Sequence, residues 1–270
     1  MNREAPLGVF DSGLGGLTVV RALRAALPHE DIIYLGDTAR VPYGTKGPAT
    51  VLRYALACTR ALVDRGVKSI VIACNTVSAV APDRLRADFD IPVLSVIEPG
   101  ARAAIRAAGD GRIGVLGTAA TIASGAYVRA VCANSTRCEV LGHAAPLLVP
   151  LAEEGWLEGE VPTLVVRHYL QPFVGRGIGA VVLGCTHYPL FRPLIEEQVR
   201  TMLGPHVPIV DSALATAEET RAFLVARDLT TTRARPGQLE FLVTDEPRAF
   251  EAVAQRFLGD TAPKATVIDL

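Results

Sequence analysis

The sequence has no long apolar run, no excess of charge and little lysine, and each absence excludes a class of protein. No stretch of the 270 residues approaches the roughly 18 apolar residues of a membrane span, so we expect no membrane segment. Lysine and arginine number 27 and aspartate and glutamate 28, which leaves a formal net charge of −1. Coating nucleic acid or an anionic membrane needs a clustered positive excess, so neither direct nucleic-acid contact nor membrane contact is expected.

The scarcity of lysine and the spacing of the cysteines argue against common cofactors. None of the three lysines (Lys46, Lys68 and Lys264) lies in a Gly- or Ser-rich context that suggests the imine-forming lysine of a pyridoxal phosphate enzyme. The cysteines are odd in number, at five, and no pair has the CxxC spacing, so neither a disulfide framework nor a structural zinc site is expected. The N-terminus has no apolar signal-peptide core, which predicts a cytoplasmic location.

Short apolar runs alternate with longer amphipathic stretches along the chain. We expect strands at 7–10, 31–35, 69–73, 93–96, 112–116, 138–141, 180–183, 208–210 and near 239–243. We expect helices at 17–27, 48–65, 82–89, around 215–226 and near 247–258. Strands that alternate with helices at this spacing indicate βαβ units, so the predicted class is α/β with mostly parallel sheets.

An internal repeat indicates how these units are organised. Four segments recur in the same order with slowly growing offsets: 7–10 at 113–116, 34–36 at 140–142, 72–74 at 183–185, and 91–93 at 207–209. Two copies of one α/β unit would explain this, and the alternative is similar strands within one large sheet. Duplication predicts a first domain of residues 1–97 plus 211–270 and a second of residues 98–210. The active site would lie in the cleft between them.

The repeat places two cysteines at equivalent positions. Cys74 and Cys185 each follow a strand at its carboxyl end, where ligands bind in open α/β sheets, and each opens a loop that leads into a helix. A helix N-terminus would lower a thiol's pKa, so both are candidate reactive groups. A free cysteine is more often a small buried hydrophobe, and this reading is favoured for Cys58, Cys132 and Cys138.

Two thiols that face each other across a cleft suit the inversion of a stereocentre. One thiolate removes a proton from one face of a carbon atom, and the other thiol delivers a proton to the opposite face. Asp11, near Cys74, and His187, two residues after Cys185, could assist the thiols as proton relays. Nucleophilic catalysis would need only one thiol and a base.

Two further segments could bind a ligand. Asp11-Ser12-Gly13 opens a loop whose glycines at 13, 15 and 16 would let backbone N–H groups approach an anion, although a plain tight turn is equally consistent. Asp37-Thr38 leads to Pro42-Tyr43-Gly44, which is either a binding loop or a structural turn.

At these residues the sequence resembles the glutamate racemase family of cofactor-independent enzymes in bacterial cell-wall precursor synthesis. The matching motifs occur in family order over most of the chain: residues 9–16 (VFDSGLGG), 42–44 (PYG), 73–76 (ACNT), 117–118 (GT) with Thr121, and 184–190 (GCTHYPL). Related aspartate and hydantoin racemases share the two cysteines but not the DSGxGG and PYG motifs, which favours glutamate.

The resemblance implies two pseudo-symmetric α/β domains that enclose the substrate, with Cys74 and Cys185 as proton donor and acceptor. It further implies a homodimer and no cofactor. It assigns substrate binding to Asp11, Ser12, Pro42, Tyr43, Gly44, Asn75, Thr76, Thr118, Thr121, Glu153, Thr186 and His187. The chain departs from the family at Ala144-Ala145-Pro146, where Ala-Cys-Pro is frequent, and at Val77 and Val80. None of these departures is at a catalytic position.

The hypothesis is therefore the interconversion of L- and D-glutamate without metal or organic cofactor. Ser12, Asn75, Thr76 and Thr186 would supply neutral donors to a substrate with two carboxylates. Three alternatives stay open: a racemase of another amino acid such as aspartate, a cysteine hydrolase or lyase that uses one thiol, and a binding or regulatory protein. Near-neutral charge gives no support for direct DNA contact by the last of these.

Overall fold

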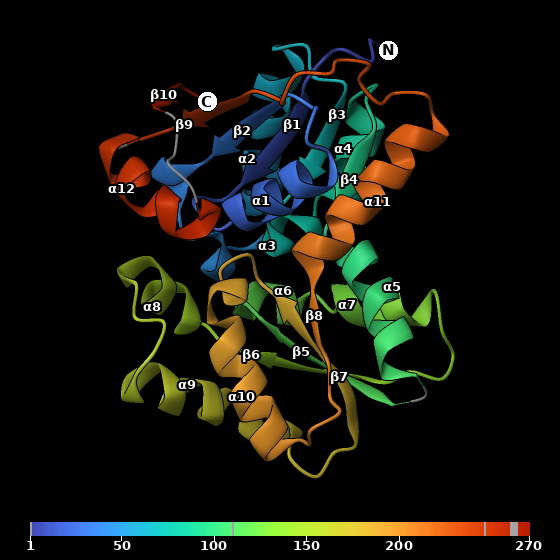
Figure 1. The fold of residues 1–270 in the computed structure, drawn as a ribbon, viewed down its shortest axis with the longest axis vertical. Coiled ribbons are helices and arrows are strands. Elements are labelled where there is room, and N and C mark those ends of the chain that lie inside the picture. Colours follow the sequence, from blue (N-terminus) through green and yellow to red (C-terminus); the bar gives the residue numbers. More distant parts are fainter. Residues whose placement is uncertain (1, 110, 246, 260–263) are drawn as a thin grey trace.

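The computed structural model describes residues 2–109, 111–245, 247–259 and 264–270. Their strands form two parallel sheets, which lie in the upper and lower halves of Figure 1. The first sheet has the order β10-β9-β2-β1-β3-β4 and the second β6-β5-β7-β8. Both ends of the chain lie at the first sheet (Figure 1). Among the described residues, no helix is both long and apolar enough to span a bilayer.

The strands of the first sheet are β1 (Leu7–Asp11), β2 (Ile32–Gly36), β3 (Ser69–Ile72), β4 (Val93–Ser95), β9 (Leu239–Val243) and β10 (Ala265–Val267). Those of the second are β5 (Arg112–Gly117), β6 (Val140–Ala144), β7 (Ile178–Gly184) and β8 (Ile209–Asp211). The α-helices are α1 (Leu17–Ala26), α2 (Pro48–Val63), α3 (Asn75–Ser78), α4 (Pro82–Asp88), α5 (Ile97–Ala108), α6 (Ala119–Ala123), α7 (Ala126–Cys132), α8 (Leu148–Glu154), α9 (Glu160–Leu170), α10 (Arg192–Met202), α11 (Ser212–Ala226) and α12 (Pro247–Leu258). Short 3-10 helices are η1 (Thr38–Arg40), η2 (Tyr43–Thr45), η3 (Gln171–Phe173) and η4 (Tyr188–Phe191).

The strand order confirms the internal repeat. The four strands β2-β1-β3-β4 and the four strands β6-β5-β7-β8 are the segments that recur in the sequence, and they have the same order and direction in their sheets. The alternative of one large sheet is therefore wrong. The C-terminal segment returns to the first sheet through β9, which pairs with β2. The domain ranges stay a prediction, and residues 1, 110, 246 and 260–263 within them lie outside the described part.

Two details of the sheets differ from expectation. The strand predicted at 138–141 is β6, which begins at Val140, and β10 was not predicted at all. Both are edge strands. An edge strand is covered on fewer sides, and β6 is only partly buried, so neither shows the continuous apolar run of a central strand such as β1 or β7.

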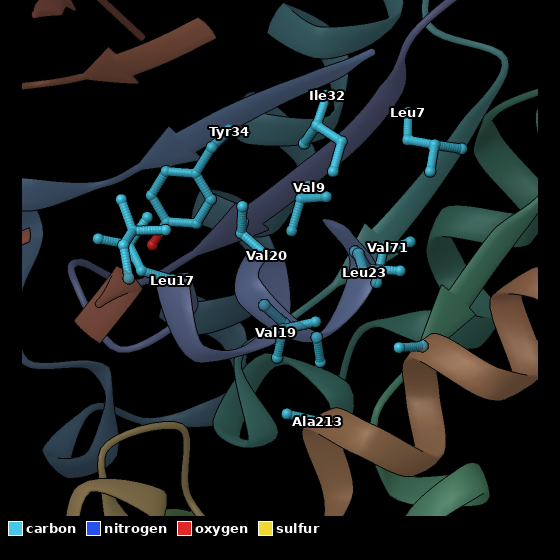
Figure 2. Packing of buried hydrophobic residues seen from close by; sticks show 14 of the residues in the cluster. Leu7, Val9, Leu17, Val19, Val20, Leu23, Ile32, Tyr34, Val71 and Ala213 are labelled. Atoms are coloured by element: carbon cyan, nitrogen blue, oxygen red, sulfur yellow. The ribbon is translucent and has the colours of Figure 1, made fainter. Parts of the chain in front are cut away.

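The hydrophobic core between α1 and the first sheet shows how an amphipathic helix covers a parallel sheet. Leu17, Val20 and Leu23 repeat every three residues, so they share one face of α1, and all three are fully buried. Figure 2 shows this face against the strand residues Val9 and Tyr34. Burying each leucine contributes roughly 1.5–3 kcal/mol, which holds α1 and the loop before it against β1.

The chain crosses between the two halves twice, and the helix that follows each crossing contacts the other. It leaves the first sheet after β4 to form α5, and it leaves the second sheet after β8 to form α11. Helix α11 packs against both α1 and α5. Helices α11 and α5 lie on the same flank of the molecule, α11 beside the first sheet and α5 beside the second (Figure 1). The carboxyl ends of β1, β3, β5 and β7 are thereby held on facing sides of one site.

Candidate active site

A cavity of about 320 Å³ lies between the loops that follow the strands of the two sheets. The predicted site residues that line it are Ser12, Pro42, Tyr43, Gly44, Cys74, Asn75, Thr76, Thr118, Glu153, Cys185, Thr186 and His187. The predicted residues Asp11 and Thr121 do not line the cavity and lie directly behind it, where both are buried. The topology thus brings together residues from both copies of the repeat.

Cys74 lies two residues after the end of β3 and is the N-cap residue of α3. Its thiol donates a hydrogen bond to the hydroxyl of Ser12, with 3.6 Å between Sγ and Oγ. Burial, together with the charge of Asp11, raises the pKa of the Cys74 thiol to about 12. The predicted lowering is therefore wrong for Cys74, because desolvation outweighs the hydrogen bond from the backbone N–H of Val77. At neutral pH this thiol holds its proton and can act as a donor.

Cys185 follows β7 and is the first member of a chain of polar groups. Its Sγ lies 3.9 Å from Nδ1 of His187, and Nε2 of His187 lies 3.0 Å from Oε1 of Glu153 on α8. Burial acts to lower the pKa of His187, but the hydrogen bonds to Cys185 and Glu153 outweigh it and raise this pKa to about 10. The ring of Phe257 packs edge-on against the imidazole. His187 can therefore stabilise a thiolate at Cys185.

We expect the shifted pKa of His187 to make stability depend on pH. Its folded-state pKa of about 10 is above the roughly 6.5 of an unfolded histidine, so the protonated form favours folding. This contribution is fully present below about pH 6.5 and is lost as pH rises toward 10. The difference in urea-unfolding free energy between the native protein and His187→Asn should shrink across this window.

The matched control is His206→Asn, since His206 is an exposed histidine of the same half. It should not reproduce the pH trend. An equal stability difference at pH 6 and pH 9.5 for His187→Asn would contradict the prediction.

Asp11, at the end of β1, organises the glycine-rich loop. Its Oδ2 accepts a hydrogen bond of 3.0 Å from the N–H of Gly13, and the carbonyl of Gly13 accepts one of 2.7 Å from Tyr34. Burial raises the pKa of Asp11, although His187 and the backbone N–H groups of the loop oppose this. Its charge also raises the pKa of Cys74, so the carboxyl and the thiol interact electrostatically.

Three threonine hydroxyls join the two halves next to the cavity. The Oγ1 of Thr76 lies 2.9 Å from that of Thr118 and 3.3 Å from that of Thr121, and the last two are 2.9 Å apart. Thr118 also caps α6 by accepting the N–H of Thr121. Hydroxyls can donate or accept, so this group can reorient toward a ligand at little cost.

The turn at 42–44 closes the cavity from the first half. The hydroxyl of Tyr43 donates to the buried carboxylate of Asp37, which also accepts from Arg40. A Cβ built on Gly44 would lie 2.9 Å from Cβ of Thr118, so the turn touches the second half where only a glycine fits. The turn is therefore part of the site.

Some lining residues were not predicted from the sequence. They are Val41, Thr45, Ala119, Pro146, Val149 and Pro150. Val149 could have been found, because it lies four residues before Glu153 and hence on the same face of α8. Tyr127 donates a hydrogen bond to Asn75 across 52 positions in sequence, and no local pattern indicates such a contact.

The chemistry that the site can support follows from these groups. Among the described residues, the cavity lining has two thiols, several hydroxyls, one side-chain amide, one histidine and one glutamate, and neither lysine nor arginine. No group of three or more His, Cys, Asp or Glu in the described part of the chain is arranged to hold a metal ion. The arrangement suits proton transfer by thiols to and from a small polar ligand.

Comparisons with known proteins agree with this geometry. The model of the Asp/Glu/hydantoin racemase family matches residues 17–220. Glutamate racemase from Neisseria meningitidis is 46% identical, over 100% of this chain and 98% of the relative.

Solved structures are also similar along the whole chain. Glutamate racemase from Francisella tularensis in complex with D-glutamate has a TM-score of 0.91 and 37% identity, covering 99% of this chain and 98% of the other. The enzyme from Thermus thermophilus in complex with β-chloro-D-alanine has a TM-score of 0.89 and 43% identity, covering 100% and 99%. This chain therefore belongs to the Asp/Glu/hydantoin racemase family, and within it to the glutamate racemases.

Proposed function

We propose that this protein interconverts L- and D-glutamate by a two-base mechanism that uses Cys74 and Cys185 and no cofactor. One observation carries the proposal: the two cysteines follow equivalent strands of two sheets with the same order, and both line one cavity. The D-glutamate bound to the Francisella tularensis relative supports glutamate as the substrate.

In the proposed reaction one thiolate removes the α-proton, and the other thiol protonates the opposite face of the carbanion. The electron pair of the broken C–H bond stays on the α-carbon until the second S–H bond supplies its proton. His187 would assist Cys185 directly, with Glu153 behind it on the other ring nitrogen. Asp11 would assist Cys74, whose pKa its charge raises. Proton exchange with water then resets the two thiols.

The α-hydrogen of an amino acid is a very weak acid, so the site must stabilise the developing carbanion. We assign this to neutral donors on the α-carboxylate in a cavity that excludes water. Ser12, Asn75 and Thr186 line the cavity and can donate, and Thr76 and Thr118 contribute hydroxyls. The predicted binding roles of Pro42, Tyr43, Gly44 and Thr121 would be to shape and support this pocket.

A hydrogen-isotope experiment tests the two-base mechanism. Protiated L-glutamate is incubated with the protein in D₂O without cofactor, and the reaction is stopped early. We expect the D-glutamate to carry deuterium at the α-carbon, because the second thiol has exchanged its proton with solvent. The remaining L-glutamate should stay largely protiated, and both pools can be measured by mass spectrometry after chiral separation.

The opposite labelling pattern would exclude two independent bases. A single base that serves both faces would return some of the substrate's own protons to the product. It would also exchange deuterium into the unreacted L-glutamate. The result does not depend on which thiol serves which enantiomer.

The same proposal places the protein in the cytoplasm as a homodimer that supplies D-glutamate for peptidoglycan precursors. Its membership of the glutamate racemases supports this role. Exposed apolar side chains on and beside α8 and α9, namely Leu147, Trp156, Val161 and Leu164, are consistent with a covered surface there.

A further inference from the structure

Asn75 is held by a tyrosine from the other half of the molecule. The hydroxyl of Tyr127, on α7, donates a hydrogen bond of 2.8 Å to Oδ1 of Asn75, on α3. Both residues are almost fully buried, at 3% and 2% exposed. Asn75 lines the cavity, whereas Tyr127 does not. The contact therefore links a group at the cavity wall to the interior of the second half.

The hydrogen bond leaves the other end of the amide unpaired. Nδ2 of Asn75 is buried and has no hydrogen-bond partner among the described residues. An unpaired buried donor costs about 1–3 kcal/mol, so it is expected to be satisfied when a ligand binds. Because Oδ1 is engaged by Tyr127, the group that remains available is a donor.

The phenol itself has little freedom. A Cβ on Gly184 would lie 3.2 Å from Cε2 of Tyr127, and a Cβ on Gly100 would lie 3.5 Å from its hydroxyl oxygen, so backbone packs closely around the ring. Burial raises the pKa of Tyr127, so the hydroxyl keeps its proton and can donate at neutral pH. The hydroxyl has a single proton, which it donates to Oδ1 of Asn75, and the side chain of Ser212 is a second hydrogen-bonding partner of the phenol. This arrangement favours the orientation in which the amide oxygen faces Tyr127.

We propose that Tyr127 is a positioning residue that orients the Asn75 amide so that Nδ2 is presented to a substrate carboxylate. A carboxamide that is free to flip could turn its oxygen toward that carboxylate, which would be repulsive. Tyr127 prevents the flip and thereby favours an anionic group at this point of the cavity. The inference rests on the proposed function, since it assigns the orientation of one of the proposed donors.

Tyr127→Phe tests the proposal because it removes only the hydroxyl. We expect KM for glutamate to rise about tenfold, because a flipped amide turns its oxygen toward the carboxylate already in the bound substrate. We expect kcat to fall as well, since Asn75 is one of the donors proposed to stabilise the carbanion. Tyr169→Phe is the matched control, since Tyr169 is a buried tyrosine of the same half whose hydroxyl accepts from the backbone N–H of Leu147. It should leave KM within about twofold.

A double-mutant cycle separates positioning from a structural role. In an Asn75→Ala background, Tyr127→Phe should change KM no further, because the amide it orients is gone. A merely structural effect of the hydroxyl would instead add to that of Asn75→Ala. Additive effects on KM, or an unchanged KM in Tyr127→Phe, would overturn the proposal.

Asn75→Asp gives an independent test if Tyr127→Phe does not fold. It keeps an acceptor for Tyr127 and replaces the donor Nδ2 by an oxygen, so it should raise KM more than Asn75→Ala does. If Asn75→Asp binds glutamate at least as well as Asn75→Ala, the proposed orientation is wrong. Native protein that does not racemise glutamate would refute the proposed function instead, so the two failures are distinguishable.

Discussion

Cys74→Ala and Cys185→Ala are each expected to lower racemisation roughly 10²- to 10⁴-fold, the range for loss of a general acid or base. In every turnover one cysteine removes the α-proton and the other delivers the new proton. Loss of either cysteine therefore impairs racemisation from L- to D-glutamate and from D- to L-glutamate. Because the enantiomers have equal free energies, kcat/KM must fall equally in both directions. Optical rotation with L- and then D-glutamate as the starting substrate measures this.

The other three cysteines provide the controls. Cys132 is exposed, Cys58 is buried within α2, and the thiol of Cys138 donates to the carbonyl of Gly109. Replacing any of them by alanine should leave the rate within a few-fold. Full activity in either Cys74→Ala or Cys185→Ala would refute the two-base mechanism. A hydrolase or lyase with one nucleophilic thiol predicts that one of the two cysteines is dispensable.

Gly15→Ala is expected to reduce kcat/KM by about 10²-fold although residue 15 carries no reactive group. A Cβ at this position would lie 2.2 Å from Oγ1 of Thr186 and 2.5 Å from Nδ1 of His187. Thr18 holds the two segments together by donating to the carbonyls of both Gly15 and Thr186. The new methyl group must therefore displace the loop after Cys185, and a shift of about 1 Å in such groups can cost this much activity.

Gly47→Ala is the matched control for this substitution. Gly47 lies in the same half, and a Cβ built on it meets no atom within 4 Å. Steady-state kinetics and thermal denaturation of both variants distinguish a local shift from unfolding. Near-native kcat/KM in Gly15→Ala would show that the glycine loop does not position the loop after Cys185.

Much of the architecture can be predicted from the pattern of apolar and polar residues along short segments of the chain. The recurring segments predict two copies of one α/β unit, and the sheets β2-β1-β3-β4 and β6-β5-β7-β8 confirm it. Buried parallel strands are nearly continuous in apolar residues, so β1, β3 and β7 are evident as short apolar runs in the sequence. The edge strands β6 and β10 carry a weaker pattern because fewer of their side chains are covered.

The sequence by itself determined the class of fold, the repeat and the two cysteines at equivalent strand ends, because each is recognised by comparing short runs of consecutive residues. Only the tertiary structure decided the environment of those groups. Burial beside Asp11 raises the pKa of Cys74, and Glu153 reaches His187 from 34 residues away. Tyr127 reaches Asn75 from the opposite half. Desolvation and hydrogen bonding between distant segments depend on packing in three dimensions, which no local spacing of residues records.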